Sequence, residues 1–264
     1  MVALIPAAGA LPFGAPAARF TPVCFMSARI SKPTVNVHSR PGTQDEFVFD
    51  EIFKRNVYRL PDRFKAEDVI VDVGAHIGCF SFSCLLRGCG EVWAYEPDQA
   101  NFELLEKNCG YFTGFTAINK AVWRSDKLEP EVLFSGYDGG LNACGFCTRV
   151  EGAVIRGDAT NIKYIPAVEL DFILEVCGQR RIRLLKIDAE GAEYPALYTC
   201  TKLHLVDEIC GEAHDLTDYP RIVEKYPHNV HGLKEFLQGQ GFQVEVVDQP
   251  SQPGNSLFFA NRAA

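Results

Sequence analysis

A small set of residues in the first half of the chain has the types and the spacing of a nucleotide site. Asp72 and Gly74 end an apolar run, Gly78 lies in the turn that follows, and Glu96 ends a second apolar run 22 positions after Gly74. Glycines let the backbone approach a ligand closely, and an acid about 20 residues later can hold ribose hydroxyls. The pattern indicates binding of an adenosine-bearing cofactor.

The glycine spacing favours one such cofactor, S-adenosylmethionine. A dinucleotide fingerprint has a middle glycine where the pyrophosphate lies, and none stands between Gly74 and Gly78. The Asp72 carboxylate would repel phosphate but suits a cofactor that carries positive charge. Three alternatives stay open: a turn that binds no ligand, a nicotinamide-dependent oxidoreductase, and a non-catalytic binding protein that keeps the fold.

Acidic residues and a histidine also follow two later apolar runs. Asp188 and Glu190 follow one run, and Glu212 and His214 close the next. Ligands of open parallel sheets bind at the carboxyl ends of the strands, so these side chains are expected at one rim. His214 is the first candidate for a general base because its pKa is normally near neutrality. Asp188 and Glu190 are alternatives, or would position an acceptor hydroxyl.

Metal binding has weaker support in the sequence. Asp188, Glu212 and His214 together could hold a divalent metal, but no short-spacing motif joins them. Cys144 and Cys147 form a lone C-x-x-C without a second pair, which is weak evidence for zinc. We therefore predict no metal and interpret the two cysteines as loop thiols.

The hydrophobic pattern predicts strands that alternate with helices. The expected strands are 69–73, 91–96, 116–123, 183–188 and 206–214, followed by the closing pair FQVEVVD and SLFFANR; the expected helices are 78–88, 99–108, 167–177, one from Glu193, and 230–239. This order predicts a doubly wound α/β fold with helices on both faces of a mostly parallel sheet. The last pair, joined by a turn, predicts an antiparallel edge.

The remaining segments divide the chain into regions. Residues 1–32 are rich in Ala, Pro and Gly and are expected to be a flexible tail rather than a signal peptide. PTVNVHSR and EFVFDEIF alternate as strands do, so 33–65 is expected to form a small N-terminal cap. The main domain is expected over 66–264, with the Gly-rich stretch 124–166 as an insertion on the substrate side.

Composition bears on the partners. The chain has 264 residues, a net charge of −8 and 47% hydrophobic residues. General binders of nucleic acid or anionic membranes are basic, so neither partner is expected. Several of the ten cysteines fall inside expected helices and strands, which favours a reduced, cytoplasmic protein. The oligomeric state is left open.

Longer stretches of the chain resemble a known family. D-V-G-A-H-I-G, A-Y-E-P-D-x-x-N-F-E-L-L-E-x-N, N-K-A-V-W-R-S-D and L-L-K-I-D-A-E-G-A-E look like the FkbM-type branch of class I S-adenosylmethionine-dependent methyltransferases. The resemblance covers about 66–262, and K-I-D-A-E-G-A-E (186–193) is its most specific part. That family usually has Asn where this chain has His76.

The resemblance implies a fold and a set of roles. The fold would be a seven-stranded sheet whose last two strands reverse direction. Asp72, Gly74 and Gly78 would line the methionine part of the cofactor, and Glu96 would hold the ribose hydroxyls. His76 and Asp188 would lie near the methionine moiety, and the backbone near Ala121 would contact the adenine.

The acceptor is expected to be a hydroxyl on a small molecule. Amino and amide N-methyltransferases of this fold often have an (Asp/Asn)-Pro-Pro-(Tyr/Phe) loop after the fourth strand, and this chain has Asp188-Ala-Glu190-Gly191 there. The family resemblance also implies O-methylation, of a sugar or a natural-product scaffold. Methyl transfer to an alcohol needs a base to take its proton, and the candidates are His214, Asp188 and Glu190.

Overall fold

The computed structural model describes most of the chain. Its described residues are 24–29, 34–137, 145–148, 159–218, 221–249, 252 and 254–262. Within these ranges every helix is too short or too polar to cross a membrane.

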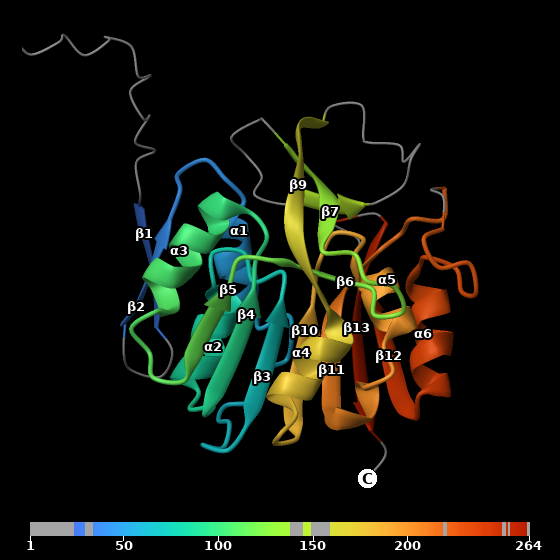
Figure 1. The fold of residues 1–264 in the computed structure, drawn as a ribbon. Coiled ribbons are helices and arrows are strands. Elements are labelled where there is room, and N and C mark those ends of the chain that lie inside the picture. The colour runs from blue at the N-terminus through green and yellow to red at the C-terminus, as the bar shows by residue number, and fades with distance from the viewer. Residues whose placement is uncertain are drawn as a thin grey trace, which may run out of the picture.

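A seven-stranded sheet forms the centre of the molecule (Figure 1), with the strand order β12-β13-β11-β10-β3-β4-β5. Its strands are β3 (Val69–Val73), β4 (Glu91–Tyr95), β5 (Phe115–Ile118), β10 (Ile182–Ile187), β11 (Val206–His214), β12 (Phe242–Asp248) and β13 (Asn255–Arg262). The neighbours from β11 to β5 pair in parallel, whereas β13 pairs antiparallel with both β11 and β12. The predicted doubly wound sheet with an antiparallel edge is confirmed.

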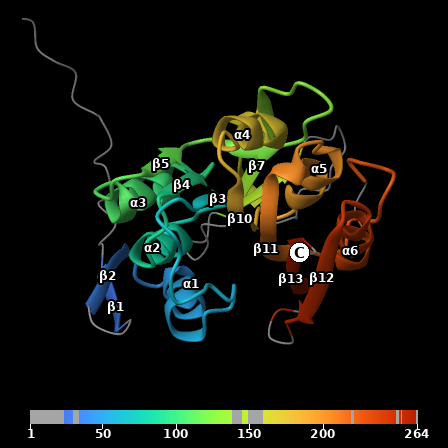
Figure 2. The ribbon, with the colours of Figure 1, turned by 90° about the horizontal axis from the view of Figure 1, so that it is seen from below.

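Helices cover both faces of this sheet, as the view along its strands shows (Figure 2). One face carries α4 (Leu170–Cys177), α5 (Glu193–Thr199) and α6 (Val230–Gly239), and the other carries α1 (Asp45–Phe49), η1 (Asp50–Arg55), α2 (Cys79–Leu86) and α3 (Gln99–Cys109). The short 3₁₀ turn η2 (Leu203–Leu205) leads into β11. Each face has its own buried apolar cluster, because β3 is buried along its whole length and sends alternate side chains to opposite sides.

A smaller sheet stands above the carboxyl ends of the main strands (Figure 1). Its strands are β6 (Ala121–Trp123), β7 (Glu131–Tyr137), β8 (Gly145–Thr148) and β9 (Ala159–Glu169), in the order β6-β9-β7-β8. The N-terminal region adds a hairpin of β1 (Cys24–Arg29) and β2 (Thr34–Ser39) beside α3. The smaller sheet contributes residues to the site described below.

Some predicted elements are wrong. The stretch 46–53, expected as a strand, is helical in α1 and η1, and its buried Phe49 and Ile52 pack with α2. The single strand expected over 116–123 is split at Asn119 and Lys120, so β5 ends the main sheet and β6 begins the smaller one. The helix expected from 167 begins at 170, because β9 extends to that point. Cys144 and residues 1–23 lie outside the described residues.

Candidate functional site

A cavity of about 470 Å³ opens at the carboxyl ends of β3, β4, β10 and β11. It is lined by residues of the main sheet, of the smaller sheet and of the N-terminal cap. Gly74, His76 and Glu96 lie on its β3–β4 side, and Asp188 and Glu190 lie on its β10 side. The topology of the sheet therefore brings together segments that are far apart in the sequence, at the rim where open α/β sheets bind ligands.

Glu96 anchors the β3–β4 side of the cavity. Its Oε2 accepts a hydrogen bond of 2.7 Å from the backbone N–H of His76, and its Oε1 accepts one of 2.9 Å from the backbone N–H of Asp98. Burial raises the pKa of Glu96 to about 7, although these backbone donors favour the carboxylate. Oε1 also accepts a hydrogen bond of 3.3 Å from the Asn101 amide, so the remaining acceptor position is on Oε2, where a ribose hydroxyl could bind.

His76 lies next to Glu96 in an uncommon backbone conformation, with φ of 53°. Its Nε2 is 3.4 Å from an Oδ1 of Asp45 in α1, and neither ring nitrogen makes a hydrogen bond. Burial lowers the pKa of His76 to about 4, against the attraction of Asp45. The ring is therefore neutral at physiological pH, and it joins the cap to the cavity.

Apolar residues line the cavity beside Glu96. They are Tyr95, Pro97, Ala121, Val122 and Phe134, and they are called the apolar slot below. The Asn119 side chain holds the neighbouring turn by donating a hydrogen bond of 2.8 Å to the backbone carbonyl of Glu96. An apolar group of side chains beside a carboxylate has the chemistry of an adenine site next to a ribose site.

Asp72 lies below the cavity and does not line it. Its Oδ2 accepts a hydrogen bond of 2.6 Å from Ser81, and its Oδ1 is 3.4 Å from the Nζ of Lys186 on the neighbouring strand. The Lys186 ammonium in turn donates to the backbone carbonyl of Gly74, at 2.7 Å. Burial lowers the pKa of Lys186, but Asp72 and Asp188 outweigh it and raise the pKa above its usual value. Asp72 therefore acts on the site through Lys186.

Gly78 also lies behind the cavity wall. It precedes α2 with φ of 91°, and a Cβ there would come within 2.8 Å of Leu105 in α3. The glycine therefore lets α2 and α3 pack closely, while Gly74 forms the wall itself.

Tyr58 from the cap completes the β10 side of the site. Its hydroxyl donates a hydrogen bond of 2.9 Å to Oδ2 of Asp188, and its ring meets Phe80 edge-on. The phenol is buried, and burial raises its pKa well above the usual value, so it stays a donor. Asp188 is thereby held between a phenol and the Lys186 ammonium, which lies 3.7 Å away.

We expect Tyr58→Phe to lower the turnover of the protein rather than its stability. The substitution keeps the ring and its packing but removes the hydrogen bond that orients Asp188, a loss of about 1–2 kcal/mol. Turnover should therefore slow about tenfold, while the melting temperature should fall by only a few degrees. Steady-state kinetics beside thermal unfolding checks this. An unchanged kcat would show that the Asp188 orientation does not depend on Tyr58.

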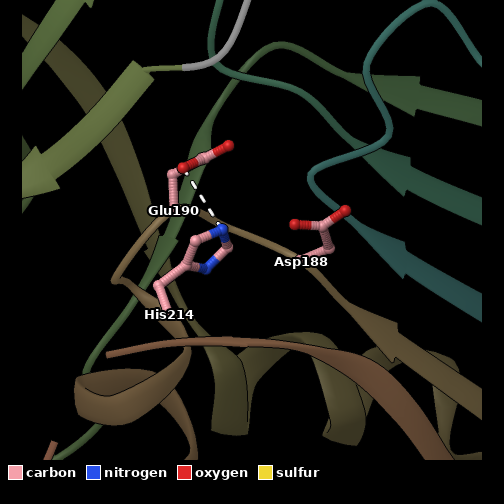
Figure 3. A group of neighbouring side chains, drawn as sticks. All are labelled: Asp188, Glu190 and His214. Carbon is pink, nitrogen blue, oxygen red and sulfur yellow. Dashed lines mark ion pairs between the residues drawn. The ribbon is translucent and has the colours of Figure 1, made fainter. Parts of the chain in front are cut away.

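Asp188, Glu190 and His214 converge at the ends of β10 and β11 (Figure 3). One ligand-type atom from each lies within 4.8 Å of the other two. Nε2 of His214 is 3.3 Å from Oε2 of Glu190 and 4.0 Å from Oε2 of Glu212. Glu190, Glu212 and Asp188 line the cavity, whereas His214 lies behind Glu190.

Glu193 fixes the orientation of His214. Its buried Oε1 is 3.0 Å from Nδ1 of His214 and accepts the backbone N–H of the same residue, and its Oε2 accepts the N–H of Gly191. Nδ1 therefore carries a proton, and Nε2 points toward Glu190. Burial alone lowers the pKa of His214, but the carboxylates of Glu190 and Glu193 outweigh it and raise the pKa well above the usual value.

Two other cavity-lining acids are also unusual. Burial, reinforced by Asp188, raises the pKa of Glu212 to about 8. Burial raises the pKa of Glu51 to about 7, although Arg55 opposes this. Acids and bases with shifted pKa values gather in functional clefts, and this cavity has several of them.

The structure thus brings most of the sequence-predicted residues to one place. The residues that line the cavity are Gly74, His76, Glu96, Ala121, Asp188 and Glu190, and His214 adjoins it. Sequence reasoning missed the contribution of the cap, above all Tyr58 and Glu51, and no motif marks either residue. Lys186 stands inside K-I-D-A-E-G-A-E, so a buried cation between two acids was the signal that could have identified it.

Two known proteins are similar to this chain in sequence. "Methyltransferase 1" of Beauveria bassiana is 24% identical over 80% of this chain and 87% of its own length. The AMB antimetabolite synthetase AmbE of Pseudomonas aeruginosa is 26% identical over 77% of this chain, but the match spans only 11% of that protein.

Two solved structures are similar to this chain at low sequence identity. SMU.1697c of Streptococcus mutans, in complex with SAH, is 9% identical with a TM-score of 0.45, over 83% of this chain and 97% of that one. Precorrin-6y C5,15-methyltransferase of Geobacter metallireducens is 13% identical with a TM-score of 0.43, over 85% and 93%.

The family model of the methyltransferase FkbM domain matches residues 72–244, which is well over half of the chain and contains the strand ends that line the cavity. The resemblance seen in the sequence motifs is thereby confirmed, and the protein belongs to the FkbM methyltransferase family.

Proposed function

We propose that the cavity binds S-adenosylmethionine and that the protein transfers its methyl group to a hydroxyl oxygen of a small molecule. The observation that carries the first part is the wall formed by Gly74, His76 and Glu96 beside an apolar slot. The glycine backbone and the carboxylate suit the amino-acid and ribose parts of the cofactor, and the slot suits the adenine. Asp72 is tied to Lys186 beneath this wall, so it supports the site indirectly.

The reaction requires the protein to align donor and acceptor, and it does not require a covalent intermediate with the protein. The sulfonium of S-adenosylmethionine is already an activated methyl donor. The acceptor oxygen attacks the methyl carbon, the carbon–sulfur bond breaks, and S-adenosylhomocysteine leaves as a neutral thioether. The hydroxyl proton must go to a base during the attack.

We assign the handling of that proton to Glu190, Asp188 and His214. Glu190 lines the cavity and is 3.3 Å from Nε2 of His214, which Glu193 orients from behind. Asp188, held by Tyr58, would position the hydroxyl. His214, the first candidate base in the sequence, would then act through Glu190 because it lies behind that residue.

Cofactor titration is the direct test of the donor. We expect S-adenosylmethionine to give a binding isotherm by calorimetry and NADH to give none. A matched control is Leu128→Ala, a substitution of a side chain that is 78% exposed, which should leave the isotherm unchanged. Binding of NADH without S-adenosylmethionine would favour the oxidoreductase instead.

Glu190→Gln tests the proton-transfer role. The amide keeps the size of the side chain but cannot accept a proton, so we expect kcat to fall about 100-fold. The dissociation constant of S-adenosylmethionine should stay within about threefold, since Glu190 lies on the acceptor side. Release of S-adenosylhomocysteine from S-adenosylmethionine and a panel of sugar and polyol acceptors is the measurement. A variant as fast as the parent protein would remove Glu190 from the mechanism.

The proposal also covers the class of acceptor and the cellular location. The acceptor is a small molecule rather than a nucleic acid or a membrane, as the net charge of −8 supports. The cytoplasm is the proposed location, supported by seven cysteines whose thiols are buried and free: Cys79, Cys84, Cys89, Cys109, Cys177, Cys200 and Cys210.

A further inference from the structure

The cluster of Asp188, Glu190 and His214 has a geometry that proton transfer alone does not require. A divalent cation bound to oxygen and nitrogen at about 2.1 Å holds neighbouring ligand atoms roughly 3–3.5 Å apart. The separation of 3.3 Å between Nε2 of His214 and Oε2 of Glu190 falls in this range. Oxygen of Asp188 lies within 4.8 Å of both, so small side-chain rotations would complete a facial set of ligands.

The histidine is also prepared in the manner of a metal ligand. The His214 side chain is only 7% exposed and is aimed into the cluster from behind (Figure 3). Its Nδ1 donates to the buried carboxylate of Glu193, so its Nε2 faces carboxylate oxygens of Glu190 and Glu212. Histidines that bind metals almost always donate their other ring nitrogen to such a partner, which fixes the tautomer.

The charges around the cluster also favour a cation. The carboxylates of Asp188, Glu190, Glu193 and Glu212 converge around this point, and the Lys186 ammonium among them is shared with Asp72. Asp188 and Glu190 are about one-quarter exposed on the cavity side. A cation held there would balance the carboxylates and keep coordination positions open toward the cavity.

We propose that Asp188, Glu190 and His214 bind a divalent cation whose open positions face the acceptor hydroxyl. The inference rests on the proposed function, because it assigns the ion to the acceptor side of the same cavity. The mixed oxygen and imidazole ligands suit Mn²⁺ or Zn²⁺. With the ion bound, Glu190 would serve as a ligand and no longer as the proton acceptor. An alcohol oxygen bound to the ion would lose its proton more easily, and the proton would pass to Glu212, which lines the cavity outside the ligand set, or to solvent. The proposal differs in this respect from the sequence-based expectation of a metal-free site.

Manganese binding to the full chain tests the proposal without any acceptor. After dialysis against a chelator, the protein is titrated with Mn²⁺ and the free ion is followed by electron paramagnetic resonance, with and without S-adenosylhomocysteine. We expect one site per chain. Glu190→Gln and His214→Gln should each weaken binding by at least tenfold. Glu131→Gln, the same change at an exposed position on β7, should leave the affinity unchanged.

Several outcomes separate the ion from the methyl donor. No Mn²⁺ or Zn²⁺ binding, or equal binding by parent and cluster variants, overturns the cation site while normal S-adenosylmethionine binding leaves the proposed function standing. If the parent protein does not bind S-adenosylmethionine, both the cation site and the proposed function are overturned. Thermal unfolding and cofactor affinity of each variant show whether it is folded, so a collapsed variant is not scored. If His214→Gln fails to fold, Glu190→Gln decides alone.

Discussion

Replacement of Gly74 by alanine should unfold the site rather than merely weaken it. Gly74 has φ of 74°, and a Cβ placed on it would lie 1.8 Å from the backbone carbonyl oxygen of Asp188. Neither strand can yield, because the Asp188 N–H is bonded to Val73 and the Gly74 N–H is bonded to Tyr95. We expect a loss of about 3–5 kcal/mol from steric overlap and backbone strain together. In thermal unfolding the midpoint should fall by about 10 °C.

The chain offers a matched control at Gly42. This glycine has the same φ of 74°, but a Cβ there would meet no atom within 4 Å. Gly42→Ala therefore carries the backbone strain without the collision and should cost about 1 kcal/mol. If the two variants lose equal stability, the close contact between the β3 and β10 turns does not exist as described.

Removal of the Glu96 carboxylate should have the largest effect on the cofactor. In the proposed site the remaining position on Oε2 accepts a hydrogen bond from a ribose hydroxyl, and a bond to a charged acceptor contributes about 1.5–3 kcal/mol. Glu96→Ala should therefore weaken S-adenosylmethionine about 10- to 100-fold in a calorimetric titration. The same change also removes acceptors for the backbone N–H groups of His76 and Asp98. Affinities within threefold of the parent would place the ribose elsewhere.

Glu96 also predicts how stability changes with pH. Its pKa is raised to about 7 in the folded protein, so the folded state holds a proton that the unfolded state releases near pH 4.5. The free energy of unfolding should fall as pH rises from about 4.5 to 7, by at most about 3 kcal/mol from this group. Glu96→Gln, which does not titrate, should lack that part of the slope. Denaturant unfolding of both proteins at pH 5 and pH 8 is the measurement, and parallel curves would show that Glu96 titrates normally.

The main sheet could be predicted because its signals are local. β3 and β10 are short apolar runs that end in acids and glycines, and α3 begins at an N-cap aspartate, Asp98, whose carboxylate accepts from the N–H groups of Ala100 and Asn101. The FkbM resemblance then extended this pattern to the strand order. The rim of the cavity followed, since parallel strands present their carboxyl ends at one edge.

The rest of the site depends on contacts that the sequence does not record. The stretch 46–53 alternates like a strand, yet packing of Phe49 and Ile52 against α2 makes it helical, because burial outweighs a weak local preference. Asp72 matches a ligand-binding motif, but Lys186 on the adjacent strand pairs with it. Neither the hydrophobic alternation nor a sequence motif points to Tyr58, because its partner Asp188 is 130 residues away.

The long reach of the cap has a consequence for synthesis on the ribosome. Tyr58 bonds to Asp188, and the neighbouring Arg59 pairs with Glu245, so the cap leaves the exit tunnel long before either anchor exists. A nascent chain that ends before Asp188 has the cap and half of the central sheet but no closed cavity. The chamber therefore closes only after the β10 segment has been made, and a chain truncated before Asp188 should show an undocked cap to a protease.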